Sequence, residues 1–514
     1  MERIRWKDTG EYIPSEQIRQ WYYRGSLKSC NYQCSYCPFS KRTSSEDMLN
    51  KDKMHLFRFV RYIEEHKDIS GAVQIVPYGE ALIHPYYWEA LALISRYDRV
   101  EAVGAQTNLS FPVEEMLNLF VQQGGVLEKL RLWATFHPQM VSAEVFAKQC
   151  KTLSRRGVKY CVGTVGVPEN LPEIKKMRQL LGEDVYLWIN KMDGLGRNYT
   201  EAEIQEFLTI DEYFDMELTY HKADSALCGT SLFVEADGSI KGCNIAGKCI
   251  GNLYSEVIDK TDSICSRKEC SCFMAYNNRR DDALVFFQPY PAFRIPAYPK
   301  AVFFDVDGTI VPEGQQEVPK QLCKKIKALS RHCDIYLATS LPVEEANRKT
   351  RGISSCIRGG VYANGGHCLI LSAENAGYES VASIETAWIT DAKDKQGKYG
   401  YKLHVYERKG EVYKVTFSFS KNRIKKEKDR TAFVQKIVDD VNVPKDCRWI
   451  MEKNCLQITR AGKGKLEGVL ELIEVLGYGV SDILTIGNSE NDIPMLEYFP
   501  HSIAVRDGRM KAFF

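Results

Sequence analysis

Three cysteines near the start of the chain have the spacing of an iron–sulfur ligand set. They lie in Cys30-Asn-Tyr-Gln-Cys34-Ser-Tyr-Cys37, with an aromatic residue directly before the last one. Three thiolates on one short loop can hold three irons of a cubane cluster and leave the fourth iron open to a ligand from solution. Unpaired buried thiols or a structural zinc site are the alternatives, but structural zinc normally takes four protein ligands. The triplet therefore favours a cluster with one open iron.

Two carboxylates in the second half of the chain have a different chemistry. An apolar run leads directly into them in Ala301-Val-Phe-Phe-Asp305-Val-Asp307-Gly308-Thr309. A buried parallel strand that delivers two aspartates to its carboxyl end, followed by a glycine turn, suits a metal-assisted nucleophile. Asp305 can attack a phosphorus atom and Asp307 can move the proton. A calcium-like loop or a simple turn is the alternative for this stretch alone.

A second group of cysteines follows a hairpin pattern with an Asp-Gly turn at residues 237–238. Four thiolates in this region suit an iron–sulfur cluster and a zinc ion equally well. The group consists of Cys228, Cys243, Cys249, Cys265, Cys270 and Cys272. The other cysteines are scattered and mostly in apolar contexts, so we expect them to be small buried hydrophobic residues.

The elements that must position these groups alternate between strand and helix patterns. Apolar strand-like runs recur about every 25 to 30 residues in the first half, at residues 71–76, 100–106, 130–136 and 160–167. Repeated strand, turn and helix patterns predict consecutive βα units and a parallel sheet, here a partial barrel. Active sites of such barrels lie at the carboxyl ends of the strands. We therefore expect an α/β protein with a first site at the ends of these strands.

Residues 1–215 resemble the radical S-adenosylmethionine (SAM) enzymes. The loop Cys30 to Cys37 has the spacing of the family's cluster loop, and Val76-Pro-Tyr-Gly79-Glu80 resembles its Gly-Gly-Glu-Pro loop, although Tyr78 departs from that pattern. Thr107-Asn108 resembles the strand end near the SAM ribose. The resemblance implies a radical SAM partial (β/α)6 barrel.

The same resemblance implies the cofactors and the chemistry of this half. Cys30, Cys34 and Cys37 would hold a [4Fe-4S] cluster chelated by SAM, with Gly79 and Glu80 at the SAM ammonium group and Thr107 and Asn108 near the ribose. An electron donor such as flavodoxin or ferredoxin would then allow SAM to be cleaved to a 5′-deoxyadenosyl radical.

Residues 216–280 resemble the SPASM and twitch extensions of radical SAM enzymes. The shared pattern runs from Cys228 through Gly238 to Cys243 and continues in Ile250-Gly-Asn-Leu253. The resemblance implies an auxiliary [4Fe-4S] cluster in a small Fe-S extension. Because a full SPASM domain has more cysteines, we expect one auxiliary cluster. Its expected ligands are Cys228, Cys243, Cys270 and Cys272, with Cys249 or Cys265 as substitutes.

Residues 299–514 resemble the haloacid dehalogenase (HAD) phosphohydrolases. The motifs occur in order: Asp305 to Thr309, a strand from Asp334 ending at Thr339, Lys463-Gly464 before an amphipathic stretch, and Ile483 to Leu496 with Asn488 and Asp492. The resemblance implies a Rossmann-like HAD domain. Asp305, Asp307, Asn488 and Asp492 would hold Mg²⁺, Thr339 would bind a phosphoryl oxygen, and Lys463 would neutralise the charge, with Lys465 as a competitor for that role.

Two features of this half qualify the resemblance. Asn488 replaces the family's usual first acid of the last motif, which removes one negative charge from the magnesium site. The loss of one carboxylate weakens magnesium binding but need not abolish it. The segment Ile357 to Gly366 resembles the Asn-Gly segment of the Cof-like subgroup, which implies an α/β cap at about residues 370–450 that closes over the substrate. A domain that only binds a phosphorylated ligand is the alternative to an active phosphatase.

Composition and length fit this plan. The 514 residues suffice for about three domains, and a net charge of +2 gives no general attraction to nucleic acid. We expect no membrane association, because no apolar stretch approaches the roughly 20 residues that span a bilayer. The first residues have no apolar signal core, so we expect a reducing, cytoplasmic location. Four prolines in residues 289–299 predict a stiff connector, and we place a linker at 281–298.

Together these patterns predict a bifunctional enzyme that combines radical SAM chemistry with Mg²⁺-dependent phosphate ester hydrolysis of a related small molecule. One alternative is a peptide-modifying SPASM-type enzyme whose HAD half only binds a ligand. Another is a binding protein whose cluster senses redox state, but such a sensor needs no SAM pocket. The substrate itself is not specified by these motifs, because substrate residues lie on variable loops and the cap.

Overall fold

The computed structural model divides into two compact units, Gly10–Ala297 and Tyr298–Phe514 together with Met1–Thr9. The residues that it describes are 2–3, 20–37, 42–67, 69–219, 221–222, 231–245, 249–255, 257–258, 269–270, 272, 287–288, 293–371, 377–420, 423 and 430–505. Cys228 and Cys265 lie outside the described residues. No helix in the described part of the chain is both long and apolar enough to cross a membrane.

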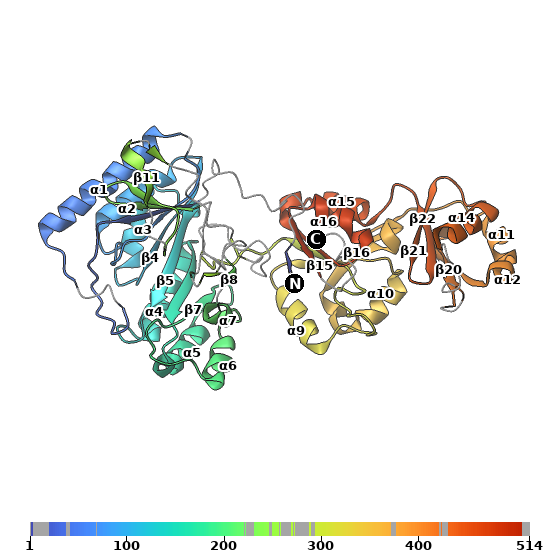
Figure 1. Ribbon diagram of the computed structural model, residues 1–514, viewed down its shortest axis with the longest axis horizontal. Helices are drawn as coiled ribbons and strands as arrows, with labels where there is room; N and C mark the ends of the chain where they lie inside the picture. Colours follow the sequence, from blue (N-terminus) through green and yellow to red (C-terminus); the bar gives the residue numbers. More distant parts are fainter. Residues whose placement is uncertain are drawn as a thin grey trace. The chain divides into compact units, whose positions relative to one another are not determined.

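The first unit is built on parallel strands that follow one another in chain order (Figure 1). The strands are β2 (Gln20–Gly25), β3 (Gly71–Ile75), β4 (Val100–Thr107), β5 (Leu130–Phe136), β6 (Lys159–Val165) and β7 (Leu187–Asn190). Each pairs in parallel with the next. Parallel neighbours require a crossover between them, and helices provide these crossovers. The strand-like runs predicted from the sequence are confirmed.

The helices of this unit pack their apolar faces on the sheet. They are α1 (Glu46–Glu65), α2 (Pro85–Ser95), α3 (Val113–Gln122), α4 (Ala143–Arg155), α5 (Leu171–Leu180), α6 (Glu201–Leu208) and α7 (Phe214–Leu218). In α1, Leu56, Phe59 and Ile63 recur at the helical period and join one core cluster with strand residues. Ser45 begins this helix by accepting a hydrogen bond from the Met48 amide.

A set of short strands extends the sheet beyond β2. They are β9 (Ser231–Glu235), β10 (Ser239–Lys241), β11 (Cys249–Asn252) and β12 (Val257–Ile258). β9 pairs in parallel with β2, and the others continue antiparallel. Gly238 has a φ of 87° in the turn, a left-handed conformation that favours glycine, which confirms the predicted Asp-Gly hairpin. β8 (His221–Lys222) and β13 (Glu269–Cys270) form a separate pair.

The end of the predicted linker is part of a core. Phe293 and Ile295 are buried in a cluster with Trp133 and Trp188. Arg294 between them is also buried and forms an ion pair with Asp211. The prediction of an extended connector at 281–298 is therefore wrong for residues 293–295. The physical reason is that burying the aromatic and aliphatic side chains among the prolines is favourable in free energy. Residues 281–286 and 289–292 lie outside the described part.

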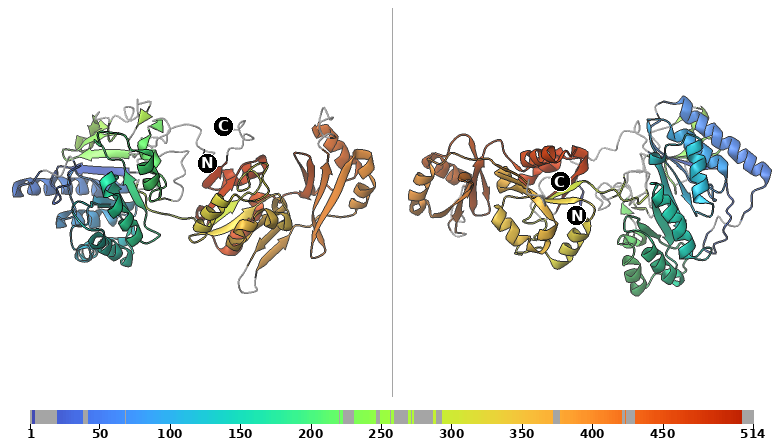
Figure 2. Two further views of the ribbon diagram at one scale, coloured as in Figure 1. Left: turned by 90° about the horizontal axis from the view of Figure 1, so that it is seen from below. Right: turned by 180° about the vertical axis from the view of Figure 1, so that it is seen from behind.

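The second unit contains a mixed sheet flanked by helices on both faces (Figures 1 and 2). Its order is β1 (Glu2–Arg3), β24 (His501–Ala504), β23 (Ile483–Gly487), β14 (Ala301–Phe304), β15 (Asp334–Ala338), β16 (Ile357–Tyr362), β17 (His367–Ile370) and β18 (Tyr378–Val381). β24 through β16 are parallel. The helices are α9 (Lys320–Leu329), α10 (Val343–Lys349), α15 (Lys465–Leu476) and α16 (Ile493–Tyr498). This is a Rossmann-like α/β arrangement, as expected.

A second, smaller sheet lies within this unit. It consists of β19 (Tyr401–Arg408), β20 (Glu411–Phe419), β22 (Cys455–Arg460) and β21 (Cys447–Glu452), all antiparallel. Its helices are α11 (Ile389–Asp394), α12 (Gln396–Tyr399) and α14 (Arg430–Asp440). We call this part the cap. The predicted bounds of 370–450 are wrong at both ends, because β18 pairs with the main sheet and β22 completes the cap sheet.

Candidate active sites

The carboxyl end of β14 delivers Asp305 to a buried ion pair. Lys465, the first residue of α15, lies 2.7 Å from Asp305 Oδ1 and 2.6 Å from Asp492 Oδ1 through its Nζ atom. The two partners Asp305 and Lys465 are only 4% and 2% exposed. Burial and the neighbouring Asp492 raise the pKa of Asp305 to about 7, against the opposing effect of Lys465. Burial disfavours the Lys465 ammonium, but the two carboxylates outweigh it and raise its pKa.

Lys463, the lysine predicted from the sequence, does not reach this site. Its Nζ donates a hydrogen bond of 2.7 Å to Glu471 Oε2, and its side chain is 39% exposed. Lys465 takes the predicted place because it is the buried first residue of α15, whereas Lys463 lies two residues before the helix. The predicted assignment of Lys463 is therefore corrected to its neighbour Lys465.

Asp492 is engaged on both oxygens. Oδ2 accepts hydrogen bonds from the Asn488 amide at 3.0 Å and from the amide and hydroxyl of Ser489, both at 2.9 Å. Oδ1 receives the Lys465 ammonium. Asp492 therefore stabilises the loop after β23 and places Lys465, and its role as a magnesium ligand stays a prediction.

The Thr309 hydroxyl connects the Asp305 carboxylate with the Asn488 side chain. The Thr309 hydroxyl lies 3.2 Å from Asp305 Oδ2 and 3.3 Å from Asn488 Oδ1. Gly308, with a φ of 85°, makes the turn that returns the chain to this point. Asp307 points into a cavity and forms an ion pair with Lys349. Oxygen ligands of this type suit Mg²⁺, which keeps several waters at sites with few protein ligands.

Thr339 directly follows the neighbouring strand β15, at the strand end where it was predicted. Its side chain is buried, and its hydroxyl oxygen accepts a hydrogen bond of 3.2 Å from the Leu341 amide. The next residue, Ser340, lines the cavity. The carboxyl ends of β14, β15 and β23 thus meet at one edge of the sheet, as the parallel order requires.

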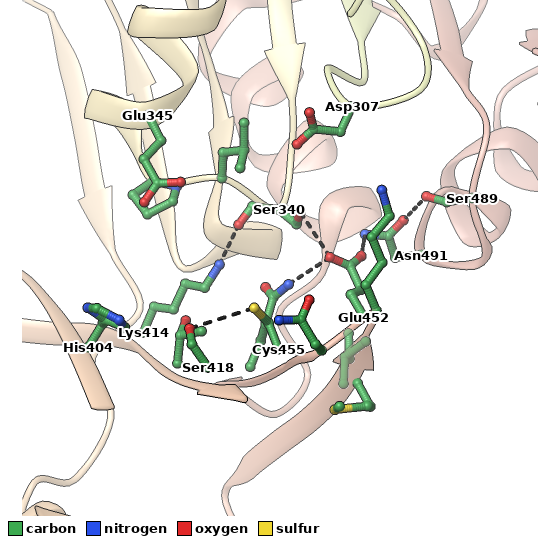
Figure 3. Close-up of a pocket in the computed structure, with 18 of the residues that line it drawn as sticks. Asp307, Ser340, Glu345, His404, Lys414, Ser418, Glu452, Cys455, Ser489 and Asn491 are labelled. Carbon is green, nitrogen blue, oxygen red and sulfur yellow. Dashed lines mark hydrogen bonds between the residues drawn. The ribbon is translucent and has the colours of Figure 1, made fainter. Parts of the chain in front are cut away.

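The cavity beside Asp305 has a volume of about 710 Å³ and lies between the main sheet and the cap (Figure 3). From the core it is lined by Asp305, Asp307, Ser340, Glu345, Lys349 and Asn491, and from the cap by His404, Lys414, Thr416, Ser418, Glu452 and Gln457. Figure 3 shows Glu452 between Ser340 and Asn491. Its carboxylate accepts hydrogen bonds of 3.3 Å and 3.0 Å from them. A cap carboxylate therefore contacts two loops of the catalytic edge.

The cap residues of this cavity were not predicted from the sequence. The signal was present in β20, where Lys414, Thr416 and Ser418 alternate with the buried apolar residues Val415 and Phe417. Alternate strand residues point to opposite faces. One face of the cap sheet thus packs on its helices, and the other supplies polar groups to the cavity.

The first unit has its own buried acidic site at the ends of β3 and β4. Glu80 accepts hydrogen bonds from the Thr107 hydroxyl at 2.7 Å, the Asn108 amide at 2.6 Å and the Leu82 amide at 3.1 Å. Burial raises the pKa of Glu80 to about 7, although these three donors act against it. Glu80, Thr107 and Asn108, predicted as one binding site, are thus in contact.

The cysteine loop lies against this acidic site. Asn108 Nδ2 is 3.8 Å from Cys30 Sγ, and the Glu80 amide donates to the Ser29 carbonyl at 3.0 Å. A Cβ atom on Gly79 would lie 2.0 Å from that carbonyl oxygen, so only glycine allows the two loops to approach so closely.

Cys30, Cys34 and Cys37 form no disulfide with any residue that the structure describes. Burial raises the pKa of Cys30, and it raises the pKa of Cys34 to about 11. Bound metal would reverse this preference and favour the thiolate. Among the residues that the structure describes, no three Cys, His, Asp or Glu side chains are gathered closely enough to hold a metal ion.

Three of the four cysteines predicted for the auxiliary cluster lie in the described part. The Cys272 amide contacts Cys270 Sγ at 3.4 Å, and Asn244 Nδ2 contacts Cys272 Sγ at 3.7 Å. Cys243 directly precedes Asn244, so the end of the hairpin approaches the Cys270–Cys272 segment. Cys249 is exposed and its thiol donates to the Gly251 carbonyl.

Known proteins resemble part of the second unit. Residues 361–513 match the family of haloacid dehalogenase-like hydrolases. A curated phosphoglycolate phosphatase of Methanosarcina acetivorans is 29% identical over 211 residues, which cover 41% of this chain and 84% of that protein. The chain therefore carries a haloacid dehalogenase-like hydrolase domain.

Solved structures also match the chain. A haloacid dehalogenase-like hydrolase from Bacteroides thetaiotaomicron has a TM-score of 0.33 at 12% identity, covering 39% of this chain and 86% of its own. Another from B. subtilis has a TM-score of 0.32 at 13% identity, covering 40% and 88%.

Proposed function

We propose that the second unit hydrolyses a small phosphomonoester with the help of Mg²⁺. The observation that carries this proposal is the buried pair of Asp305 and Lys465 at the edge of a cavity closed by a cap. The family match supports it, and the related phosphoglycolate phosphatase is named for a substrate of this class.

The residues divide the reaction between them. Asp305 attacks phosphorus and forms an aspartyl phosphate, while Asp307 gives a proton to the departing ester oxygen. Asp307 then takes a proton from the water that releases inorganic phosphate and restores Asp305. Lys465 holds the nucleophile and offsets negative charge. A magnesium ion held by Asp305, Asp307 and Asn488 would supply further charge neutralisation at the phosphate.

Hydrolysis of p-nitrophenyl phosphate by the full chain with Mg²⁺ tests this proposal. We expect Asp305→Asn to lower kcat by at least about a thousandfold, because the amide cannot act as the nucleophile. Asp334→Asn, at the opposite end of β15, is the matched control and should retain activity. A wild-type chain without turnover would favour the alternative of a domain that only binds phosphorylated ligands.

We further propose that the first unit binds a [4Fe-4S] cluster through Cys30, Cys34 and Cys37 and cleaves SAM. The contact of Asn108 with both Glu80 and Cys30 favours this function, because it places a buried carboxylate beside the cysteine loop. The three cysteines match the group in the type and number of ligands, and the close approach at Gly79 holds the Glu80 loop against their loop. When bound, the cluster would supply the electron for reductive cleavage.

The roles of the other residues follow from their positions. Glu80 would bind the ammonium group of SAM, and Thr107 and Asn108 would lie near its ribose. Cys243, Cys270 and Cys272, with Cys228, would hold an auxiliary cluster. The substrate of the radical is either a small molecule related to the phosphatase substrate or a peptide.

Anaerobic reconstitution with iron and sulfide counting tests the cluster assignment. About eight irons in wild type and about four in a Cys30→Ala/Cys34→Ala/Cys37→Ala variant are expected for two clusters. Formation of 5′-deoxyadenosine from SAM and dithionite should be lost in that variant. Zinc in place of iron, or no iron difference between the two proteins, would contradict the proposal.

A further inference from the structure

The cap presents a buried cation to the cavity. Lys414, on β20, is 4% exposed and points from the cap sheet toward the core (Figure 3). Its Nζ atom donates a hydrogen bond of 2.5 Å to the Ser340 carbonyl oxygen. An ammonium group can donate three hydrogen bonds, so this contact leaves capacity for a ligand.

Lys414 differs from the two other lysines that line the cavity. Lys349 forms an ion pair with Asp307, and Lys453 forms one with Glu313 at 3.1 Å. Among the residues that the structure describes, Lys414 has no carboxylate within ion-pair distance. A buried charge without a counterion is costly, and an anion that enters the cavity relieves that cost.

The carboxylates nearest to Lys414 have other partners. Glu452 accepts hydrogen bonds from Ser340, Asn491 and Gln457. Glu345 accepts one of 3.3 Å from the Tyr406 hydroxyl. Both remain close enough to favour the Lys414 ammonium electrostatically. Glu345 and Glu452 therefore favour the charged form of Lys414 without accepting a hydrogen bond from its ammonium group.

The same face of the cap offers acceptors for a hydroxyl group. Thr416 and Gln457 are directly opposite each other on β20 and β22, and both line the cavity. The Thr416 Oγ1 and Gln457 Oε1 atoms are buried and have no hydrogen-bond partner within the part of the chain that the structure describes. Unsatisfied buried oxygens favour a ligand that donates hydrogen bonds.

We propose that Lys414 binds a carboxylate of the leaving group, so that the substrate of the second unit is a small phosphorylated hydroxy acid. This inference rests on the proposed phosphatase function. The phosphate lies at Asp305, the carboxylate at Lys414, and a hydroxyl group of the ligand reaches Thr416 or Gln457.

Two phosphomonoesters that differ in the relevant group test the proposal. 3-Phosphoglycerate carries a carboxylate where glycerol 3-phosphate carries a hydroxymethyl group. We expect wild type to favour 3-phosphoglycerate in kcat/KM, and Lys414→Met to lose about tenfold to a hundredfold on this substrate, mainly through KM. Lys414→Arg should retain part of the preference. Hydrolysis of p-nitrophenyl phosphate reports whether each variant is folded and catalytically intact.

Lys402→Met is the matched control, since Lys402 is an exposed lysine on β19 of the same sheet and does not line the cavity. Equal use of both esters by wild type, or an unchanged preference in Lys414→Met, overturns the proposal. If wild type hydrolyses none of the three esters, the phosphatase function fails. Calorimetric binding of 3-phosphoglycerate and glycerol 3-phosphate to full-length Asp305→Asn then tests the role of Lys414 separately. Tighter binding of 3-phosphoglycerate that is lost when Lys414→Met is added supports the proposal, and equal affinities for the two esters contradict it.

Discussion

Lys465 and Lys463 form a matched pair for testing the catalytic assignment at the level of single residues. We expect Lys465→Met to lower kcat by about a hundredfold or more, because it removes the cation beside Asp305. Breaking a buried ion pair also costs about 3–5 kcal/mol of stability. Lys463→Met should change activity less than about twofold, since its pair with Glu471 is half-exposed. Ester hydrolysis and urea unfolding of both variants measure these effects, and equal losses would refute the assignment.

Asn488 is expected to limit magnesium affinity. Asn488→Asp restores a negative charge next to Asp305, so the magnesium concentration for half-maximal binding should fall on the order of tenfold. Calorimetric titration with Mg²⁺ measures this shift independently of turnover. Weaker or unchanged binding would show that Asn488 does not contact the ion.

The charge of Lys414 gives a pH dependence. Burial lowers the pKa of Lys414 to about 8, so its ammonium is present below that pH and is lost above it. The groups around it are Glu345, Tyr406, Glu452 and Cys455. We expect KM for 3-phosphoglycerate to rise above about pH 8 while KM for glycerol 3-phosphate stays level. A parallel rise for both esters would place the titration elsewhere.

At the scale of elements, the contact between the cysteine loop and the loop after β3 depends on Gly79. Gly79→Ala places a Cβ 2.0 Å from the Ser29 carbonyl oxygen, so the two loops must separate. We expect about 1–3 kcal/mol of lost stability and reduced iron loading at the first cluster. Gly182→Ala, where a Cβ meets no atom within 4 Å, is the control for both measurements. Full iron loading in Gly79→Ala would show that the contact is dispensable.

The alternation of apolar and polar residues in β20 is the main pattern in the sequence that predicts the structure of the cap. It predicts a strand with one face on a core, and the buried Val415 and Phe417 bear this out. It does not say what the polar face meets, because that depends on how the cap is placed over the main sheet. The bounds of the cap differed from expectation for a similar reason, since β18 and β22 are assigned to sheets by their hydrogen-bonded partners.

At the scale of the whole molecule, the two units have separate cores. The hydrophobic clusters of Gly10–Ala297 and of the second unit contain different residues. Substitutions at independent sites that share no partners are usually additive. The triple cysteine variant should therefore retain ester hydrolysis within about twofold, and Asp305→Asn should retain iron content. Loss of ester hydrolysis in a folded cysteine variant would indicate that the two sites are coupled.

The sequence alone determined the strands that precede Asp305, Thr339 and Glu80 and the order of the motifs, because burial and strand period are local properties. Only the tertiary structure decided which lysine meets Asp305, since Lys463 and Lys465 differ mainly in the direction that they face at the start of α15. It also showed that the oxygens of Asp492 are already engaged and that Lys414 is buried without a carboxylate partner among the described residues. These are contacts between residues far apart in the chain, and no local pattern encodes them.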